Sequence, residues 1–212
     1  MTPTDPHPPS LAERAVSRRI AGAEQSARAE VDALLDAGLK LMTECAPRPP
    51  RVADIVAAAG LSNDAFYRAF SGRDALVEAI VERGARELAG QVRRRMERAT
   101  GDSAEDRLRA GIAAVVRQAA DPRLAAGVRA VLAAAVTPVP HAGHAIVVLV
   151  DGLGSLFAGP ARELGAADSV RAGRTIAGAA VAALQHWLLS GHAPDEADVE
   201  QLKRFLVAGA RS

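Results

Sequence analysis

The stretch Arg51–Leu76 constrains this chain most, because its pattern predicts two short helices, a tight turn between them and the start of a third helix. Apolar residues at positions 52, 55, 56 and 59 form the stripe of a helix that packs one face on a core. Gly60 suits a left-handed turn after that helix, and Ser62 is a candidate cap for the next one. A helix, a glycine-containing turn and a helix predict a helix-turn-helix.

The second helix of this motif is predicted at about residues 63–69 and has two chemically different faces. Phe66, Ala69 and Phe70 share the spacing of a core-facing stripe. In a major groove, asparagine pairs with adenine, aspartate accepts from cytosine, and arginine binds guanine or a phosphate. The predicted outward face has this chemistry and consists of Asn63, Asp64, Tyr67 and Arg68.

A third helix is predicted to begin near Arg73, because Ser71-Gly-Arg-Asp74 matches the capping-box pattern. Arg73 would lie in its first turn, and Arg51 stands just before the first helix of the motif. Both arginines are candidates for phosphate contacts beside the groove.

Several short runs between Ile55 and Leu76 together resemble the N-terminal domain of TetR-family transcriptional regulators. They are Ile55, Ala59-Gly60-Leu61-Ser62, Phe66-Tyr67, Phe70-Ser71, Arg73-Asp74 and Leu76. The resemblance covers about residues 29–80 and implies that Tyr67 and Arg73 touch phosphates, while residues 62–64 and 68 face bases or backbone. The predicted DNA-binding residues are Arg51, Ser62, Asn63, Asp64, Tyr67, Arg68 and Arg73.

Three positions depart from the family's pattern. Arg51 stands where a helix-capping threonine is common, and Arg73 replaces the usual lysine. Ala65 stands where a threonine that contacts DNA is common, and alanine has no side-chain hydrogen bond to offer. The family's operator contacts therefore do not transfer unchanged.

The remaining sequence predicts helices only, so the expected fold class is all-α, with a three-helix helix-turn-helix domain and a larger C-terminal helical domain. The resemblance implies that this larger domain binds a ligand and forms the dimer. The first helix is predicted at about residues 26–44 and the fourth at about 73–99. Later helices are predicted near residues 103–120, 145–157, 168–190 and 195–208, with another beginning near 121. The predicted units are a disordered arm (1–25), a DNA-binding domain (26–72) and a C-terminal domain (73–212).

The arm begins Pro-rich and continues with Arg14, Arg18 and Arg19, and it has few large apolar residues to pack. Two interpretations are open: a solvated tail, or an arm that lies in the minor groove beside the recognition helix.

The resemblance also implies that the last two helices pair with those of a second subunit. The predicted dimer residues are Val181, Leu184, Trp187, Leu188, Leu202 and Phe205. Trp187 has an alternative role as a core residue of its own subunit. The ligand pocket is expected somewhere within Leu108 to Phe157, whose aliphatic composition favours an apolar or amphipathic small molecule. In that family, a pendulum-like shift of the fourth helix is the response to ligand, and the resemblance implies the same response here.

Net charge, cysteine content and hydrophobicity limit the functions that the sequence can have. The net charge of +1 arises from 26 basic and 25 acidic residues, so any DNA-binding surface must be a local patch. Cys45 is the only cysteine, which rules out an intramolecular disulfide and fits the cytoplasm; it is a candidate core thiol or redox sensor. The sequence contains no apolar run of about 18 residues, so no membrane span is predicted, and no signal peptide is recognised.

No catalytic, cofactor or metal site is predicted. His141 and His144 are three residues apart but lack carboxylate or cysteine companions. Asp151-Gly-Leu-Gly154 does not continue into a phosphate-loop pattern.

The helix-turn-helix pattern and the resemblance together predict a homodimeric, ligand-responsive regulator, most simply a repressor, that binds a palindromic operator in double-stranded DNA. The alternative is a helical small-molecule-binding or scaffold protein that does not read DNA.

Overall fold

A computed structural model describes residues 10–44, 50–99, 101, 103–121, 125–130 and 142–211, with only the backbone of residues 142–145. Regular structure in these ranges is helical throughout, which confirms the predicted all-α fold. The helices are α1 (Leu11–Glu44), α2 (Val52–Ala59), α3 (Asn63–Ala69), α4 (Arg73–Glu97), α5 (Ala104–Ala120), α7 (Ala142–Glu163), α8 (Ser169–Ser190) and α9 (Glu196–Gly209), and residues 125–130 are also helical.

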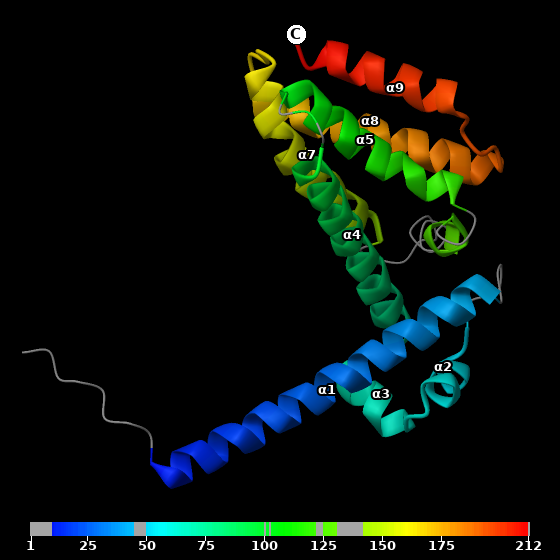
Figure 1. Ribbon diagram of the computed structural model, residues 1–212. Coiled ribbons are helices and arrows are strands. Elements are labelled where there is room, and N and C mark those ends of the chain that lie inside the picture. The colour runs from blue at the N-terminus through cyan, green and yellow to red at the C-terminus, as the bar shows by residue number, and fades with distance from the viewer. Residues whose placement is uncertain are drawn as a thin grey trace, which may run out of the picture.

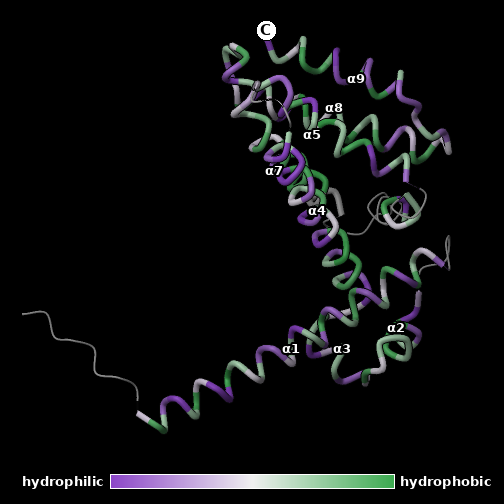
Figure 2. Tube along the Cα trace, viewed as in Figure 1, coloured by the Kyte–Doolittle hydropathy of each residue, from purple (hydrophilic) through white to green (hydrophobic). Residues whose placement is uncertain are grey.

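These helices enclose two separate hydrophobic cores (Figure 1). The smaller core lies between α1, α2, α3 and the first half of α4, with Leu34, Ile55 and Phe66 fully buried. The larger core lies between α5, α7, α8, α9 and the second half of α4. In Figure 2 hydrophobic and hydrophilic residues alternate along each helix, as helices with one buried face require.

Helix α4 belongs to both cores. Leu76 and Ile80 in its first half are buried in the smaller core, whereas Leu88 and Val92 in its second half are buried in the larger one. The predicted boundary after residue 72 assigns all of α4 to the C-terminal domain, whereas the change from one core to the other falls within α4. A continuous apolar stripe along one helix does not reveal which core each of its turns enters.

Helix α1 is longer than predicted. It begins at Leu11 rather than near residue 26, so the expectation of disorder up to residue 25 is wrong for residues 11–25. Alanine-rich sequence favours helix, and the segment extends a helix that is already anchored at its C-terminal half, which removes the cost of nucleation. Residues 1–9 lie outside the described residues.

Most predicted helix ends are confirmed. Gly60 has φ of 67°, the left-handed conformation expected after α2, and Ser103 accepts a hydrogen bond from the N–H of Asp106 at the start of α5. The capping box expected at Ser71 is absent, because α4 begins at Arg73 with Gly72 as its uncapped N-cap. Helix α7 also differs, since it continues beyond its predicted end at residue 157 and passes through Pro160.

Helices α7 and α8 approach one another closely at two glycines. A Cβ atom on Gly173 would clash with the carbonyl oxygen of Gly154 and lie 2.8 Å from the backbone nitrogen of Ala158. The segment around Gly154, considered and rejected as a phosphate loop, is thus a helix contact. The absence of side chains brings the two backbones together and closes one side of the larger core.

Replacement of Gly173 by alanine should destabilise this domain by about 1–3 kcal/mol, because backbone atoms cannot move aside for the new methyl group. Gly152 is the matched control: it is exposed on α7 with no atom near its Cβ direction, so Gly152→Ala should be neutral or stabilise the helix by up to about 1 kcal/mol. Urea unfolding followed by the fluorescence of Trp187, the only tryptophan, measures both. Equal stability of the two variants would contradict the close approach.

Candidate nucleic-acid interface

Helix α3 is held in place by its cap and by two aromatic residues. The Ser62 hydroxyl accepts a hydrogen bond from the N–H of Ala65 at 3.1 Å, as predicted for an N-cap. Phe66 is fully buried, and its ring lies 5.8 Å from that of Phe70. The ring of Tyr67 meets Phe66 edge-on at 5.3 Å, which orients a tyrosine that is itself 60% exposed.

The outward face of α3 carries the four predicted polar residues, Asn63, Asp64, Tyr67 and Arg68, which are all exposed. Ala69 is also exposed, so its predicted core position is wrong. The core side is instead occupied by Ala65 and Phe66, which are 5% and 0% exposed. The buried position of Ala65 means that no side chain at this point of α3 projects toward a ligand.

Arg68 forms an ion pair with an acidic residue of α1. Its guanidinium lies 3.4 Å from a carboxylate oxygen of Glu30, and both side chains are partly open to solvent. An exposed pair of this kind contributes little to stability, so Arg68 can exchange Glu30 for another anion at small cost.

The N-terminal ends of α2 and α4 meet at a shallow groove of about 600 Å³, lined by Pro50, Arg51, Val52, Ser71, Gly72, Arg73, Asp74 and Ala75. The start of α4 has no side-chain cap, which leaves its first backbone N–H groups available to an anion. Arg51 is exposed, and the Arg73 guanidinium binds the Asp74 carboxylate at 2.9 Å. The groove therefore combines a helix N-terminus with two arginines.

Residues 34–80, which include α2, α3 and the start of α4, match the sequence profile of the bacterial regulatory proteins of the tetR family. This segment is the one whose helix-turn-helix geometry is described above. These residues therefore form a domain of the type found in the tetR family of bacterial regulatory proteins.

Solved structures share the TetR-type fold over most of the chain. The fatty acid degradation regulator FadR from Bacillus halodurans is 20% identical, with a TM-score of 0.64 over 84% of this chain and 98% of its own. A TetR-family regulator from Streptomyces coelicolor is 21% identical, with a TM-score of 0.62 over 89% and 91%. FadR from Bacillus subtilis, in complex with stearoyl-CoA, is 15% identical, with a TM-score of 0.62 over 85% and 97%. No curated protein sequence matches the chain.

The residues predicted to form the TetR-type dimer interface divide into three groups by their exposure. Val181, Leu184 and Leu188 are 2–3% exposed within the larger core of their own chain, so their assignment to a surface between subunits is corrected. Trp187 and Leu202 are partly buried against the same core. Phe205 is 75% exposed and is available to a partner. Helical spacing identified an apolar face on α8 but not which chain covers it.

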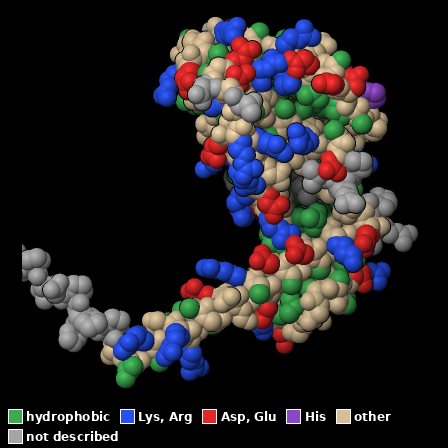
Figure 3. Space-filling view, in the orientation of Figure 1, with side chains coloured by type: hydrophobic (Ala, Val, Ile, Leu, Met, Phe, Trp, Pro, Cys, Tyr) green, Lys and Arg blue, Asp and Glu red, His purple; other side chains and the backbone are tan. Residues whose placement is uncertain are grey.

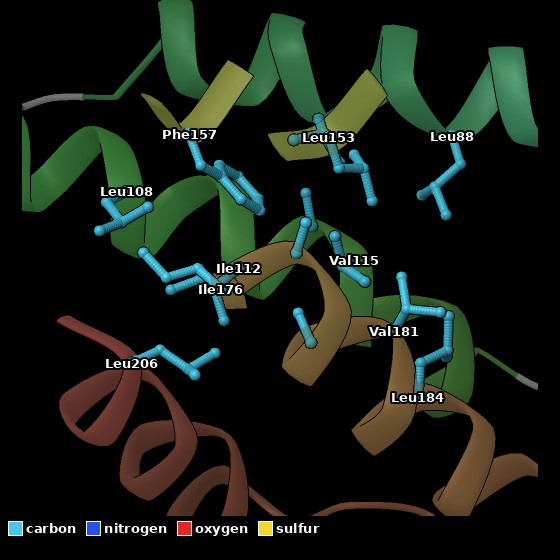
Figure 4. Close-up of a cluster of buried hydrophobic side chains, with 14 of the residues drawn as sticks. Leu88, Leu108, Ile112, Val115, Leu153, Phe157, Ile176, Val181, Leu184 and Leu206 are labelled. Carbon is cyan, nitrogen blue, oxygen red and sulfur yellow. The ribbon is translucent and has the colours of Figure 1, made fainter. Parts of the chain in front are cut away.

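The range predicted to hold the ligand pocket contributes a densely packed part of the larger core (Figure 4). Leu108, Ile112 and Val115 of α5 are fully buried against Leu153 and Phe157 of α7. Cys45 and His141 lie outside the described residues, as does the side chain of His144. Among the helices that are described, none is long and apolar enough to span a bilayer.

Two serines of the TetR-type domain allow a direct test of its caps. Ser62→Ala should lower the free energy of unfolding by about 1 kcal/mol, because the N–H of Ala65 loses its acceptor. Ser71→Ala should change it by less than about 0.5 kcal/mol, since the uncapped start of α4 does not use this hydroxyl. Thermal unfolding followed by helical circular dichroism compares them. A larger loss at Ser71 would show that α4 begins one residue earlier, with the predicted capping box formed.

Proposed function

We propose that the protein is a ligand-responsive repressor that binds a palindromic operator in double-stranded DNA as a homodimer in the cytoplasm. The observation that carries this proposal is the exposed polar face of α3 beside the uncapped N-terminus of α4. In this assignment Asn63 and Asp64 contact base edges, and Arg68 contacts a base or a phosphate. Arg51, Ser62, Tyr67 and Arg73 contact the DNA backbone.

The geometry supports different roles for the two parts of this face, one binding phosphates and the other contacting bases. The groove at Arg51 and Arg73 offers positive charge and free N–H groups, which suit phosphate oxygens. The N-terminal end of α3 offers an amide and a carboxylate, which suit base edges. Two-fold symmetry would place a second copy of α3 about 34 Å away, or a multiple of that distance, and so favours an inverted repeat.

Selection of bound duplexes from a randomised pool by the full-length protein tests the proposal, at two salt concentrations because phosphate contacts are salt-dependent. Enrichment of an inverted repeat is expected. Folded protein that enriches no sequence would favour the alternative of a helical binding or scaffold protein. One observation supports that alternative: residues 50–75 carry three arginines and three aspartates, and Arg68 and Arg73 are paired with carboxylates.

Single substitutions on the interface should separate backbone contacts from base readout. Tyr67→Phe removes one hydroxyl and should weaken binding to all duplexes by a similar factor, about fivefold to tenfold. Asn63→Ala should reduce discrimination at one base pair of each half-site by about 1–3 kcal/mol. Competition binding with single-base variants of the selected repeat measures both effects. A Tyr67→Phe variant that alters base preference, or an Asn63→Ala variant that does not, would contradict the assigned roles.

The proposed effector is an apolar or amphipathic small molecule bound in the larger domain. The aliphatic and aromatic side chains of α5 and α7 support an apolar ligand. The TetR-type FadR from Bacillus subtilis, solved with stearoyl-CoA, binds an amphipathic molecule. A ligand that prefers one position of α4 would weaken DNA binding by its difference in affinity for the two states.

The proposed dimer interface uses the surface of α8 and α9 around Trp187, Leu202 and Phe205. Phe205→Asp should raise the dimer dissociation constant by about tenfold or more, because it places a carboxylate in a desolvated contact. Val170→Asp, at the start of α8, is the control: Val170 is also an exposed apolar residue, at 61% against 75% for Phe205. Sedimentation velocity over a dilution series measures dissociation. Equal effects of both substitutions would move the interface away from Phe205.

A further inference from the structure

We infer that the exposed N-terminal part of α1, residues 11–29, is a second DNA-binding element that contacts phosphates flanking the segment read by α3. This inference rests on the proposed DNA-binding function and adds a surface that the helix-turn-helix does not contain. Its partner is identified by charge, because Arg14, Arg18 and Arg19 face solvent and form no ion pair within the described parts of the chain.

The segment is a defined helix rather than a loose tail. Ser10 and Glu13 form a reciprocal cap, in which the Ser10 N–H donates to the Glu13 carboxylate at 2.7 Å and the Glu13 N–H donates to the Ser10 hydroxyl at 3.2 Å. These hydrogen bonds lower the pKa of Glu13. Residues 11–29 are all exposed, and they carry α1 about 28 Å beyond the smaller core.

The exposed N-terminal part of α1 carries a net positive charge, whereas the helix-turn-helix does not. Residues 10–29 contain four arginines and two glutamates, whereas the charges of residues 50–75 cancel. Glu24 lies 3.8 Å from Arg28, but Arg14, Arg18 and Arg19 form no ion pair with any described acidic side chain. Figure 3 shows basic side chains gathered near the N-terminal end of α1. Unpaired, solvated cations on a rigid helix are suited to a polyanion.

The direction of α1 places this charge on the side of the domain that carries α3. Figure 1 shows α1 running past α3 and away from the larger domain. Arg19 precedes Glu30 by eleven residues, which is close to three helical turns, so both project from the same face of α1. Glu30 contacts Arg68 on the outward face of α3. Arg19 therefore faces the proposed DNA side, about 16 Å along α1 from that contact.

The width of a helix decides which part of DNA this element contacts. An α-helix with its side chains is about 10–12 Å across, whereas the minor groove is about 6 Å wide. Residues 11–29 cannot lie within the minor groove, so that interpretation of the arm is excluded for them. Arginines projecting from an external helix reach phosphate oxygens instead, which adds affinity without adding sequence preference.

The test replaces three arginines together in the full-length protein: Arg14→Ala, Arg18→Ala and Arg19→Ala. The control, Arg93→Ala, Arg94→Ala and Arg95→Ala, removes equal charge from exposed positions about 30 Å along α4 from Arg73. Both are titrated with a mixed-sequence duplex of about 40 base pairs, at salt concentrations from about 50 to 200 mM. The N-terminal variant should bind about tenfold to a hundredfold more weakly, and its salt slope should fall by about 0.9 for each lost phosphate contact.

The conservative variant with lysine at positions 14, 18 and 19 should retain most of the salt slope, because a phosphate contact needs only a positive charge. Circular dichroism confirms that each variant keeps α1 helical. Equal affinities of the N-terminal variant and the control would overturn the inference. A change in sedimentation without a change in DNA affinity would also overturn it and assign the surface, with exposed Val16 and Ile20, to contacts between copies.

Failure of this inference is distinguishable from failure of the proposed function. If the N-terminal variant binds as the control does while Asn63→Ala still alters base preference, α1 is not a DNA contact and the regulator assignment stands. If the unmodified protein binds neither the mixed-sequence duplex nor any selected repeat, both the inference and the proposed function are overturned.

Discussion

The packing of α4 into two cores is the constraint on which the rest of the structure depends. Leu76 and Ile80 of α4 lie so close to Gly38 of α1 that a Cβ there would be 2.8 Å from the Ile80 side chain. Twelve and sixteen residues after Ile80, Val92 and Met96 of the same helix are buried in the larger core, where α4 packs against α5 and α7. A continuous helix transmits displacement along its axis, so a shift of its C-terminal half must move the DNA-facing end unless the contact at Gly38 yields.

The helix-turn-helix and the N-terminal half of α1 differ in how their arginines are paired. On the helix-turn-helix, Arg68 and Arg73 each have an acidic partner, so any other anion that binds these guanidinium groups must displace Glu30 or Asp74. Such exposed pairs are weak, and exchange of one anion for another costs little. On the N-terminal half of α1, arginines face solvent without such competition. Sequence preference and general affinity for DNA can therefore reside on different helices.

Local signals predicted the helix-turn-helix closely, because its ends depend on residues near one another in the chain. The left-handed conformation of Gly60 and the Ser62 cap are such signals, and both agree with the structure. The same kind of reasoning failed at Ser71 and Pro160, where capping and proline patterns compete with tertiary packing. The side chain of Pro160 is buried between helices, and this burial offsets the hydrogen bond that proline cannot donate.

The sequence by itself determined the all-α class, the helix-turn-helix and the polar outward face of α3, because helical periodicity and caps are encoded over a few residues. Only the tertiary structure decided which apolar faces are covered within the chain: Val181, Leu184 and Leu188 look like interface residues in the sequence but fill the larger core. It also decided that α1 continues, exposed, to Leu11. Periodicity reports that a face is apolar or charged, whereas burial depends on the residues brought against it from distant parts of the chain.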